Sequence, residues 1–110
     1  MTVRLFCTAV MLFGQMVEVR ARSVLASTYG YEAGRKTASG ARYNPHGLTV
    51  AHRKLPFGTC LMLARGDRKV RVTVNDRGPF TGGRELDLST GAAHALGFSG
   101  VGRLDMQRCS

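Results

Sequence analysis

Residues 69–74, which read KVRVTV, alternate polar or charged side chains with valines. A side-chain period of two residues is the pattern of a β-strand with one apolar face and one face in water. Residues 59–64, TCLMLA, precede this segment, and residues 65–68 between the two include a glycine that suits a tight turn. The sequence therefore predicts a β-hairpin. The 14 glycines and the absence of tryptophan also fit a turn-rich β protein better than a helical bundle.

The rest of the chain after residue 26 also reads as short segments separated by turns. One helix is expected over AAHAL, capped by Ser89 or Thr90 and ended by Gly97. Short strands joined by glycine-bearing loops favour a closed barrel, because closure removes exposed sheet edges. The expected fold is all-β, a barrel of about six strands with one short helix. The further strands are expected at residues 25–31, 48–52, 85–88 and 101–107.

The N-terminal region resembles a targeting signal. Residues 5–17, LFCTAVMLFGQMV, form a mostly apolar run behind one basic residue, Arg4. This run suits the apolar part of a secretory signal and is short for a bilayer span, which takes about 20 residues. The segment after this run offers small residues, and VLA, which ends at Ala26, is the better candidate for the cleavage site. Residues 1–26 are therefore expected to be a signal peptide and residues 27–110 the barrel domain. A buried N-terminal helix or a misassigned start is the alternative.

The cysteines agree with export. The chain has three, and Cys7 lies inside the expected signal, which leaves Cys60 and Cys109 as a pair. An even number of cysteines in an exported domain predicts a disulfide. Two unpaired, small apolar side chains are the alternative. Closing a loop of roughly 50 residues would contribute about 4 kcal/mol on the chain-entropy model.

The chain is strongly basic, with 16 lysines and arginines against 7 acidic residues. A basic surface favours an anionic partner. Export argues against nucleic acid, so an anionic cell-wall or membrane surface is the better partner on charge alone. An ordinary solvated surface is the alternative.

Carboxylates are the remaining candidates for chemistry. His46, His52 and His94 stand at no metal-ligand spacing, so neither a metal site nor a cofactor is expected. No serine or threonine lies in a nucleophile-elbow context, and bonded cysteines are not nucleophiles. The acidic residues after residue 26 are Glu32, Asp67, Asp76, Glu85, Asp87 and Asp105.

Asp76 ends a strongly apolar strand and is expected at a barrel mouth, partly shielded from water. Burial raises the pKa of a carboxylic acid, as a general acid requires, whereas a nearby Arg77 would lower it. Asp87 stands two residues before the expected helix, where it can accept backbone N–H bonds. On the residues alone, a structural role for Asp76 in the turn is favoured over a catalytic one.

Five motifs in order, however, resemble the rare lipoprotein A (RlpA) family of endolytic peptidoglycan transglycosylases. The resemblance covers residues 26–108. Each motif is weak alone, whereas their order is specific. The resemblance implies a double-psi β-barrel of six strands, the barrel that expansins and barwin-like proteins use to handle polysaccharides. The motifs are ASTYG at 26–30, GRKTASG at 34–40, LTVAH at 48–52, LPFGT at 55–59, and VNDRGPF at 74–80 followed by RELDLS.

The family's chemistry implies an enzyme that cleaves the bond between N-acetylmuramic acid and N-acetylglucosamine without water. An acid protonates the leaving oxygen, and the muramic acid 6-hydroxyl attacks to give a 1,6-anhydro end. By motif match, Asp76 is the catalytic acid and base, and His52 lines the groove, where it positions sugar hydroxyls or modulates the pKa of Asp76. Arg77 is expected to bind the glycan or to hold the loop. Tyr29 is expected to stack on a sugar ring, with packing inside the protein as the alternative.

Three departures from the family pattern qualify these expectations. Ala41 occupies the position where the family usually has a glutamate, and Glu32 is the candidate substitute. Cys7 lies too early to be a lipid-attachment cysteine, so no stable membrane anchor is expected. The chain stops before the glycan-binding SPOR domain of longer relatives.

The mature protein is therefore expected to be a soluble monomer that is exported to the periplasm or secreted. Its expected partner is peptidoglycan glycan strands, preferably those lacking stem peptides. Two other classes of function stay open. One is a non-catalytic polysaccharide-binding or wall-loosening module like the expansins. The other is a secreted interaction or signalling protein like the barwin-related barrels.

Overall fold

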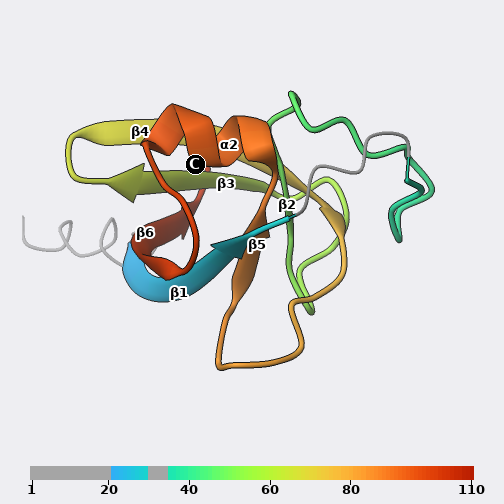
Figure 1. The fold of residues 1–110 in the computed structure, drawn as a ribbon, viewed down its shortest axis with the longest axis horizontal. Coiled ribbons are helices and arrows are strands. Elements are labelled where there is room, and N and C mark those ends of the chain that lie inside the picture. The colour runs from blue at the N-terminus through green and yellow to red at the C-terminus, as the bar shows by residue number, and fades with distance from the viewer. Residues whose placement is uncertain (1–20, 30–34) are drawn as a thin grey trace, which may run out of the picture.

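The computed structural model describes residues 21–29 and 35–110. Within these residues, six strands close into a barrel in the order β1–β5–β2–β4–β3–β6, and one helix packs against it (Figure 1). The closed six-stranded barrel and the single short helix expected from the sequence are confirmed there. The elements are β1 (Arg22–Thr28), β2 (Thr49–Ala51), β3 (Cys60–Arg65), β4 (Arg68–Asp76), β5 (Leu86–Leu88), α2 (Thr90–Leu96) and β6 (Gly102–Arg108).

The predicted hairpin is formed by β3 and β4. These strands pair antiparallel from Cys60↔Thr73 to Arg65↔Arg68. Gly66 in the turn has a φ of +64°, a conformation that residues with a Cβ rarely adopt. The valines of β4 point into the core as the alternation predicted, since Val70, Val72 and Val74 are all buried.

Two parallel strand pairs interlock the barrel. β2 runs parallel to β4, and β1 runs parallel to β5, although each pair is separated by other elements along the chain. The interior is filled by fully buried aliphatic side chains from several strands, among them Val50, Leu61, Leu86 and Leu88. Burying apolar surface is the main favourable contribution to the stability of such a core. The barrel therefore forms a rigid platform for the loops at its ends.

The helix begins and ends where the sequence indicated. Of the two candidate capping residues, the structure uses Ser89, whose side chain accepts from the Ala92 N–H at 3.1 Å. The same hydroxyl donates to the Gly47 carbonyl at 2.7 Å and so ties the helix to the loop before β2. Gly97 ends the helix in the left-handed conformation with a φ of 64°. No helix in the described part of the chain has the length and apolar character that crossing a bilayer needs.

The predicted disulfide is confirmed. Cys60 at the start of β3 is bonded to Cys109, just beyond β6. The backbone also joins the two positions, because the Cys109 N–H donates to the Cys60 carbonyl at 3.0 Å. The bond therefore ties residue 109 to a central strand, as the pairing predicted from the number of cysteines implied.

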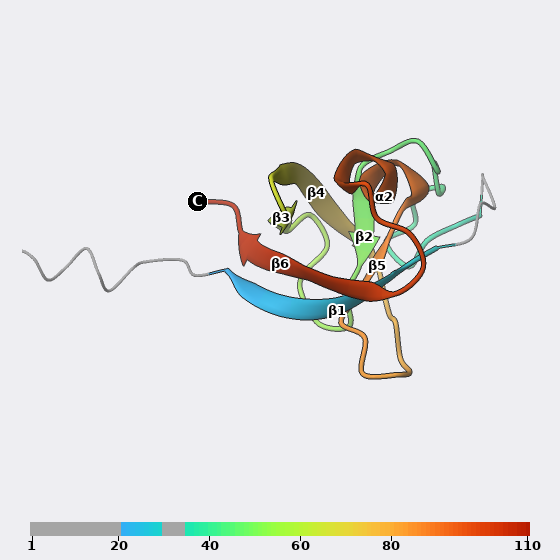
Figure 2. The same cartoon turned by 60° about the vertical axis from the view of Figure 1, so that its left-hand side comes forward.

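Strand β1 begins earlier than the sequence pattern predicted. It starts at Arg22 rather than at residue 25, and it pairs with β6 from Arg22↔Met106 to Ala26↔Gly102. Figure 2 shows the two strands side by side along the front of the barrel. Val24 and Ala26 are buried in the core. A chain beginning at residue 27 would lose this pairing, whereas the apolar run at residues 5–17 lies outside the described residues.

Removing residues 1–26 should destabilise the barrel more than removing residues 1–20. Loss of Val24 from the core alone should lower the free energy of unfolding by about 2 kcal/mol, and loss of the β1–β6 pairing adds to this. Urea denaturation of the two truncated chains, followed by circular dichroism, measures the difference. Equal unfolding midpoints would show that residues 22–26 contribute nothing to the fold.

Replacing both bonded cysteines, as in Cys60→Ser with Cys109→Ser, should also lower the free energy of unfolding. The expected loss is about 4 kcal/mol, because the unfolded chain regains the entropy of an open loop. Urea denaturation of the double variant and the oxidised parent measures it. As a control, the unreduced parent should react with an alkylating reagent at neither cysteine.

Candidate active site

A skipped residue in the barrel register positions Asp76. β2 and β4 pair Val50 with Val74, but the next pair is Ala51 with Asp76, so the register passes over Asn75. Without this irregularity, simple alternation would place Asp76 on the same face as Val74, in the core. Paired residues share a face of the sheet. Asp76 therefore shares the face of Ala51, which is opposite to the face of Val50 and Val74.

Four donors hold the carboxylate of Asp76, a residue that is only 6% exposed. Oδ2 accepts from the Tyr29 hydroxyl at 2.7 Å and from the Arg35 guanidinium at 3.3 Å. Oδ1 accepts from the backbone N–H groups of Ala38 and Arg77, each at 2.9 Å. The carboxylate is therefore rigidly oriented, and each of its oxygens has two donors.

These donors change the expected acidity of Asp76. Burial by itself raises its pKa, as the sequence analysis anticipated, but the hydrogen bonds from Ala38, Tyr29 and Arg77 and the charge of Arg35 outweigh burial. The pKa of Asp76 therefore lies below its ordinary value; of the two opposing effects that the sequence suggested, the lowering one prevails. An ionised carboxylate at neutral pH is a poor resting proton donor, but it can stabilise positive charge.

Tyr29 supports the Asp76 carboxylate. Burial is the main cause that raises the pKa of the phenol well above its ordinary value, and the hydrogen bond to Asp76 is the next. The hydroxyl therefore stays protonated and donates a hydrogen bond to the carboxylate. The ring lies edge-on to Tyr43 with centroids 4.9 Å apart, and the Arg35 guanidinium lies 5.0 Å from the Tyr29 centroid. The contact with Asp76 was not expected from the sequence. Stacking of Tyr29 on a sugar stays a prediction.

The turn at residues 37–41 supplies one of the backbone donors. Thr37 closes it, with its N–H donating to the Ala41 carbonyl at 2.8 Å and its hydroxyl donating to the same oxygen at 2.9 Å. This closure directs the Ala38 N–H at Asp76. Ala41, which stands where the resembling family has a glutamate, therefore belongs to the turn that contacts Asp76. Glu32, the candidate substitute, lies outside the described residues.

His52 is 8% exposed, and its ring faces Glu85 rather than Asp76. Nδ1 accepts from the N–H groups of Lys54 and Leu55 at 3.0 and 3.1 Å, so Nε2 carries the proton and donates to Glu85 Oε2 at 3.3 Å. Burial lowers the pKa of His52 despite the opposing effect of Glu85, so the ring is neutral at pH 7. The backbone links it to the site, since the His52 N–H donates to the Asp76 carbonyl at 3.2 Å.

Glu85 was not among the site residues predicted from the sequence. It accepts from Arg22 through both carboxylate oxygens, including Nη1 to Oε1 at 3.0 Å, and from His52. The hydrogen bond from Arg22 is the main reason that the pKa of Glu85 lies below its ordinary value. The available sequence signal was its place in RELDLS, directly before a buried strand. The pairing with Arg22 has no such signal.

Arg77 holds the loop that follows β2. Its guanidinium donates to the carbonyls of His52 at 3.1 Å and Leu55 at 2.8 Å, and it lies 4.0 Å from the centre of the Phe57 ring. Of the two roles predicted for Arg77, these contacts support holding the loop. Binding of glycan by Arg77 stays a prediction.

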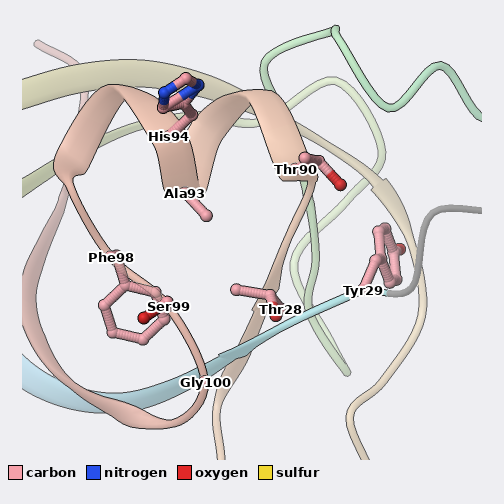
Figure 3. A pocket seen from close by; sticks show the side chains of 8 residues that line it. All are labelled: Thr28, Tyr29, Thr90, Ala93, His94, Phe98, Ser99 and Gly100. Carbon is pink, nitrogen blue, oxygen red and sulfur yellow. The ribbon is translucent and has the colours of Figure 1, made fainter.

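A hollow of about 410 Å³ lies between the end of β1, helix α2 and the loop after the helix (Figure 3). Tyr29 borders this hollow and also contacts Asp76. The wall is apolar at Ala93 and Phe98 and carries hydroxyl groups elsewhere. The lining residues are Thr28, Tyr29, Thr90, Ala93, His94, Phe98, Ser99 and Gly100.

Metal chemistry finds no support in the geometry of residues 21–29 and 35–110. Across those ranges, no group of three or more histidine, cysteine or acidic residues is placed to hold an ion. The polar side chains around Asp76 instead form a hydrogen-bonded network of a buried carboxylate, a phenol and a guanidinium.

Comparison with known proteins identifies the family. A family model described as lytic transglycolase matches residues 12–108, which is nearly all of the chain. The chain belongs to this family. The match, together with the closed six-stranded barrel, confirms the double-psi β-barrel that the ordered motifs implied.

Several curated relatives are similar over the same region. The chain is 55% identical over 83 residues to the "Probable endolytic peptidoglycan transglycosylase RlpA" of Nostoc sp.. It is 52% identical over 90 residues to the protein of the same name from Synechocystis sp.. It is 46% identical over 92 residues to the "Endolytic peptidoglycan transglycosylase RlpA" of Pasteurella multocida. These matches cover 71%, 77% and 79% of this chain, but only 22%, 28% and 31% of the relatives.

A solved structure shares the fold. The Streptomyces papain inhibitor superposes with a TM-score of 0.62 at 19% identity, over 81% of this chain and 93% of that protein. At this identity the likeness shows the fold alone. The same barrel therefore supports different functions, and the site must carry the functional argument.

Replacing Tyr29 with phenylalanine should weaken the fold in a pH-dependent way. Loss of a hydrogen bond to a charged, buried group should lower the free energy of unfolding by about 1.5–3 kcal/mol at pH 7. A carboxyl whose folded pKa is lowered contributes stability above its unfolded pKa and loses it as the pH falls through the folded pKa. The difference between variant and parent should therefore shrink at acidic pH. A difference that stays constant from pH 7 to pH 2 in urea denaturation would contradict this account.

Proposed function

We propose that this chain is an exported lytic transglycosylase that cleaves the bond between N-acetylmuramic acid and N-acetylglucosamine in peptidoglycan glycan strands. Strands lacking stem peptides are the preferred substrate, and the products end in 1,6-anhydro-N-acetylmuramic acid. Membership of the lytic transglycolase family and the names of the relatives support the reaction class. The observation that carries the proposal is the buried Asp76 carboxylate, kept ionised by four fixed donors.

The geometry suits the charge that develops in this reaction. As the glycosidic bond breaks, positive charge spreads over C1 and the ring oxygen of the muramic sugar. A fixed carboxylate stabilises that charge without reorganising, because its donors are already in place. The 6-hydroxyl of the same sugar then bonds to C1, so no water needs to be activated. Asp76 thus keeps a catalytic role, but as an ionised stabiliser rather than as the resting acid.

The hollow beside Tyr29 is the proposed place for one sugar of the strand. Its apolar wall at Ala93 and Phe98 can accept a sugar face, and the hydroxyl groups of Thr28 and Ser99 can bond to sugar hydroxyls. Tyr29 joins this subsite to Asp76, because its ring lines the hollow and its hydroxyl contacts the carboxylate. A bound strand would thereby be held next to the reacting carboxylate.

Action outside the cytoplasm follows from the proposed substrate. Peptidoglycan lies in the periplasm or at the cell surface, so we place the protein there as a soluble monomer. The Cys60–Cys109 disulfide supports an oxidising compartment. The excess of lysine and arginine would favour contact with an anionic wall.

A second candidate is a non-catalytic, glycan-binding module of the expansin type. Ala41 favours it, since the turn that contacts Asp76 lacks the glutamate of the resembling family. Such a module would use the same hollow and the same basic surface, but it would leave the glycan chain intact.

Incubation with purified sacculi and with glycan strands lacking stem peptides should separate the two candidates. The enzyme should release fragments ending in 1,6-anhydro-N-acetylmuramic acid, identified by mass spectrometry. Asp76→Asn should reduce their formation by at least about 100-fold, as loss of a transition-state stabiliser does. The matched control is Asp105→Asn, an exposed aspartate on β6, which should leave the rate unchanged. Binding to sacculi without anhydro products, from well-folded protein, would favour the binding module.

A further inference from the structure

A row of paired residues crosses four neighbouring strands and contains two aspartates. Ser27 of β1 pairs with Asp87 of β5, Asp87 pairs with Ala51 of β2, and Ala51 pairs with Asp76 of β4. Residues paired directly across a sheet present their side chains to the same face. Asp76 and Asp87 therefore share a face, although eleven positions of sequence and the loop after β4 separate them.

The spacing of this row suits a bond held between two carboxyl groups. Two strand spacings put the backbone positions of Asp76 and Asp87 about 9.5 Å apart. Ala51 stands between them; it is itself buried, at 1% exposed, and its side chain reaches only to Cβ. Paired carboxyl groups that flank a scissile glycosidic bond stand roughly 5–9.5 Å apart, and two aspartates on one face with this backbone spacing can bring their carboxyl groups within that range.

Asp87 has surroundings unlike those the sequence predicted. It lies within β5, inside the strand expected at residues 85–88, and it accepts from the Ser27 hydroxyl at 2.9 Å, whereas the sequence had suggested N–H bonds from the start of the helix. Its neighbours Leu86 and Leu88 are fully buried in the core, so the alternation of the strand turns Asp87 to the opposite face. It is partly exposed there, whereas Ser27 is buried.

The charges around the row push the two carboxyl groups in opposite directions. Burial raises the pKa of Asp87, and the charge of Asp76 raises it further, while the Ser27 hydrogen bond and the charges of Arg84 and Arg35 lower it in part. The net pKa of Asp87 lies above its ordinary value, and that of Asp76 lies below. Two carboxyl groups whose surroundings separate their acidities in this way are suited to an acid role and an ionised role.

We propose that Asp87 is the proton donor of the glycosidic cleavage and Asp76 is its ionised partner, an assignment that rests on the proposed function. The Asp87 carboxyl gives its proton to the glycosidic oxygen as the bond from C1 to that oxygen breaks. The bonding electrons leave with the oxygen, which becomes the 4-hydroxyl of N-acetylglucosamine. The cationic sugar faces Asp76. Its 6-hydroxyl oxygen bonds to C1 and returns a proton to the Asp87 carboxylate, so the site is restored without the glutamate that Ala41 replaces.

The choice of leaving group tests this division of roles. On glycan strands, Asp87→Asn should lower kcat/KM by about 100-fold or more, because an alkoxide leaves poorly without a proton. On a 2,4-dinitrophenyl glycoside of N-acetylmuramic acid, the leaving group needs no proton, and release of 2,4-dinitrophenolate in a single turnover reports bond cleavage before the 6-hydroxyl gives up its proton. Asp87→Asn should therefore retain a single-turnover release rate within about 10-fold of the parent. Asp76→Asn should be impaired on both substrates, and Asp105→Asn on neither. Equal loss by Asp87→Asn on both substrates would overturn the proposal.

A second variant keeps the proposal testable if Asp87→Asn fails to fold. Ser27→Ala retains the acid but removes the hydrogen bond that lowers its pKa. The alkaline limb of the pH profile of kcat/KM should therefore move to higher pH, since Asp87 stays protonated further. A limb that does not move would overturn the assignment.

The two proposals fail in different ways. A well-folded parent that forms no anhydro products on any glycan would overturn the proposed function and, with it, the role of Asp87. A parent that is active on glycan, beside a folded Asp87→Asn variant of equal activity, would overturn the role of Asp87 alone. Products ending in a reducing N-acetylmuramic acid would overturn the proposed function, because water rather than the 6-hydroxyl would then have attacked.

Discussion

Closure of the barrel puts β2 between β4 and β5. One skipped residue in the β2–β4 register places Asp76 on the same face of the sheet as Ala51, rather than on the core face with Val74. The hydrogen bonds to the Asp76 carboxylate depend on this placement. With ordinary alternation, a charged group would face an aliphatic core, which costs far more than a single domain of this size can offset. Because of the irregularity, the carboxylate meets its hydrogen-bond donors and lies on the same face of the sheet as Asp87.

The donors around Asp76 explain why a buried carboxylate can remain charged. Burial alone would raise its pKa, but two backbone N–H groups, a phenol and a guanidinium reverse that effect. They come from the end of β1, from the loop at residues 35–43 and from Arg77. Among residues 21–29 and 35–110, the Ser27 hydroxyl donates to Asp87, and burial and the charge of Asp76 outweigh it, so Asp87 retains its proton to higher pH. The different surroundings, rather than the shared residue type, separate the two carboxyl groups.

A second network links the N-terminal strand to the loop after β2. Arg22, the first residue of β1, bonds to Glu85, and Glu85 accepts from His52. The His52 backbone N–H reaches the Asp76 carbonyl, and Arg77 holds the carbonyls of His52 and Leu55. Residues before the expected signal boundary therefore contribute both to the core and to the surroundings of the site. The boundary at residue 26, read from small residues alone, takes no account of this pairing.

The sequence by itself determined the strand class, the hairpin, the helix with its Ser89 and Gly97 ends, and the Cys60–Cys109 pair, because these follow from local periodicity, capping and cysteine number. Ordered motifs also pointed to Asp76 and His52. Only the tertiary structure decided the lowered pKa of Asp76, the bond between His52 and Glu85, and the row that contains Asp87. These depend on strand register and on donors from distant segments, and no local pattern encodes which distant groups meet when a barrel closes.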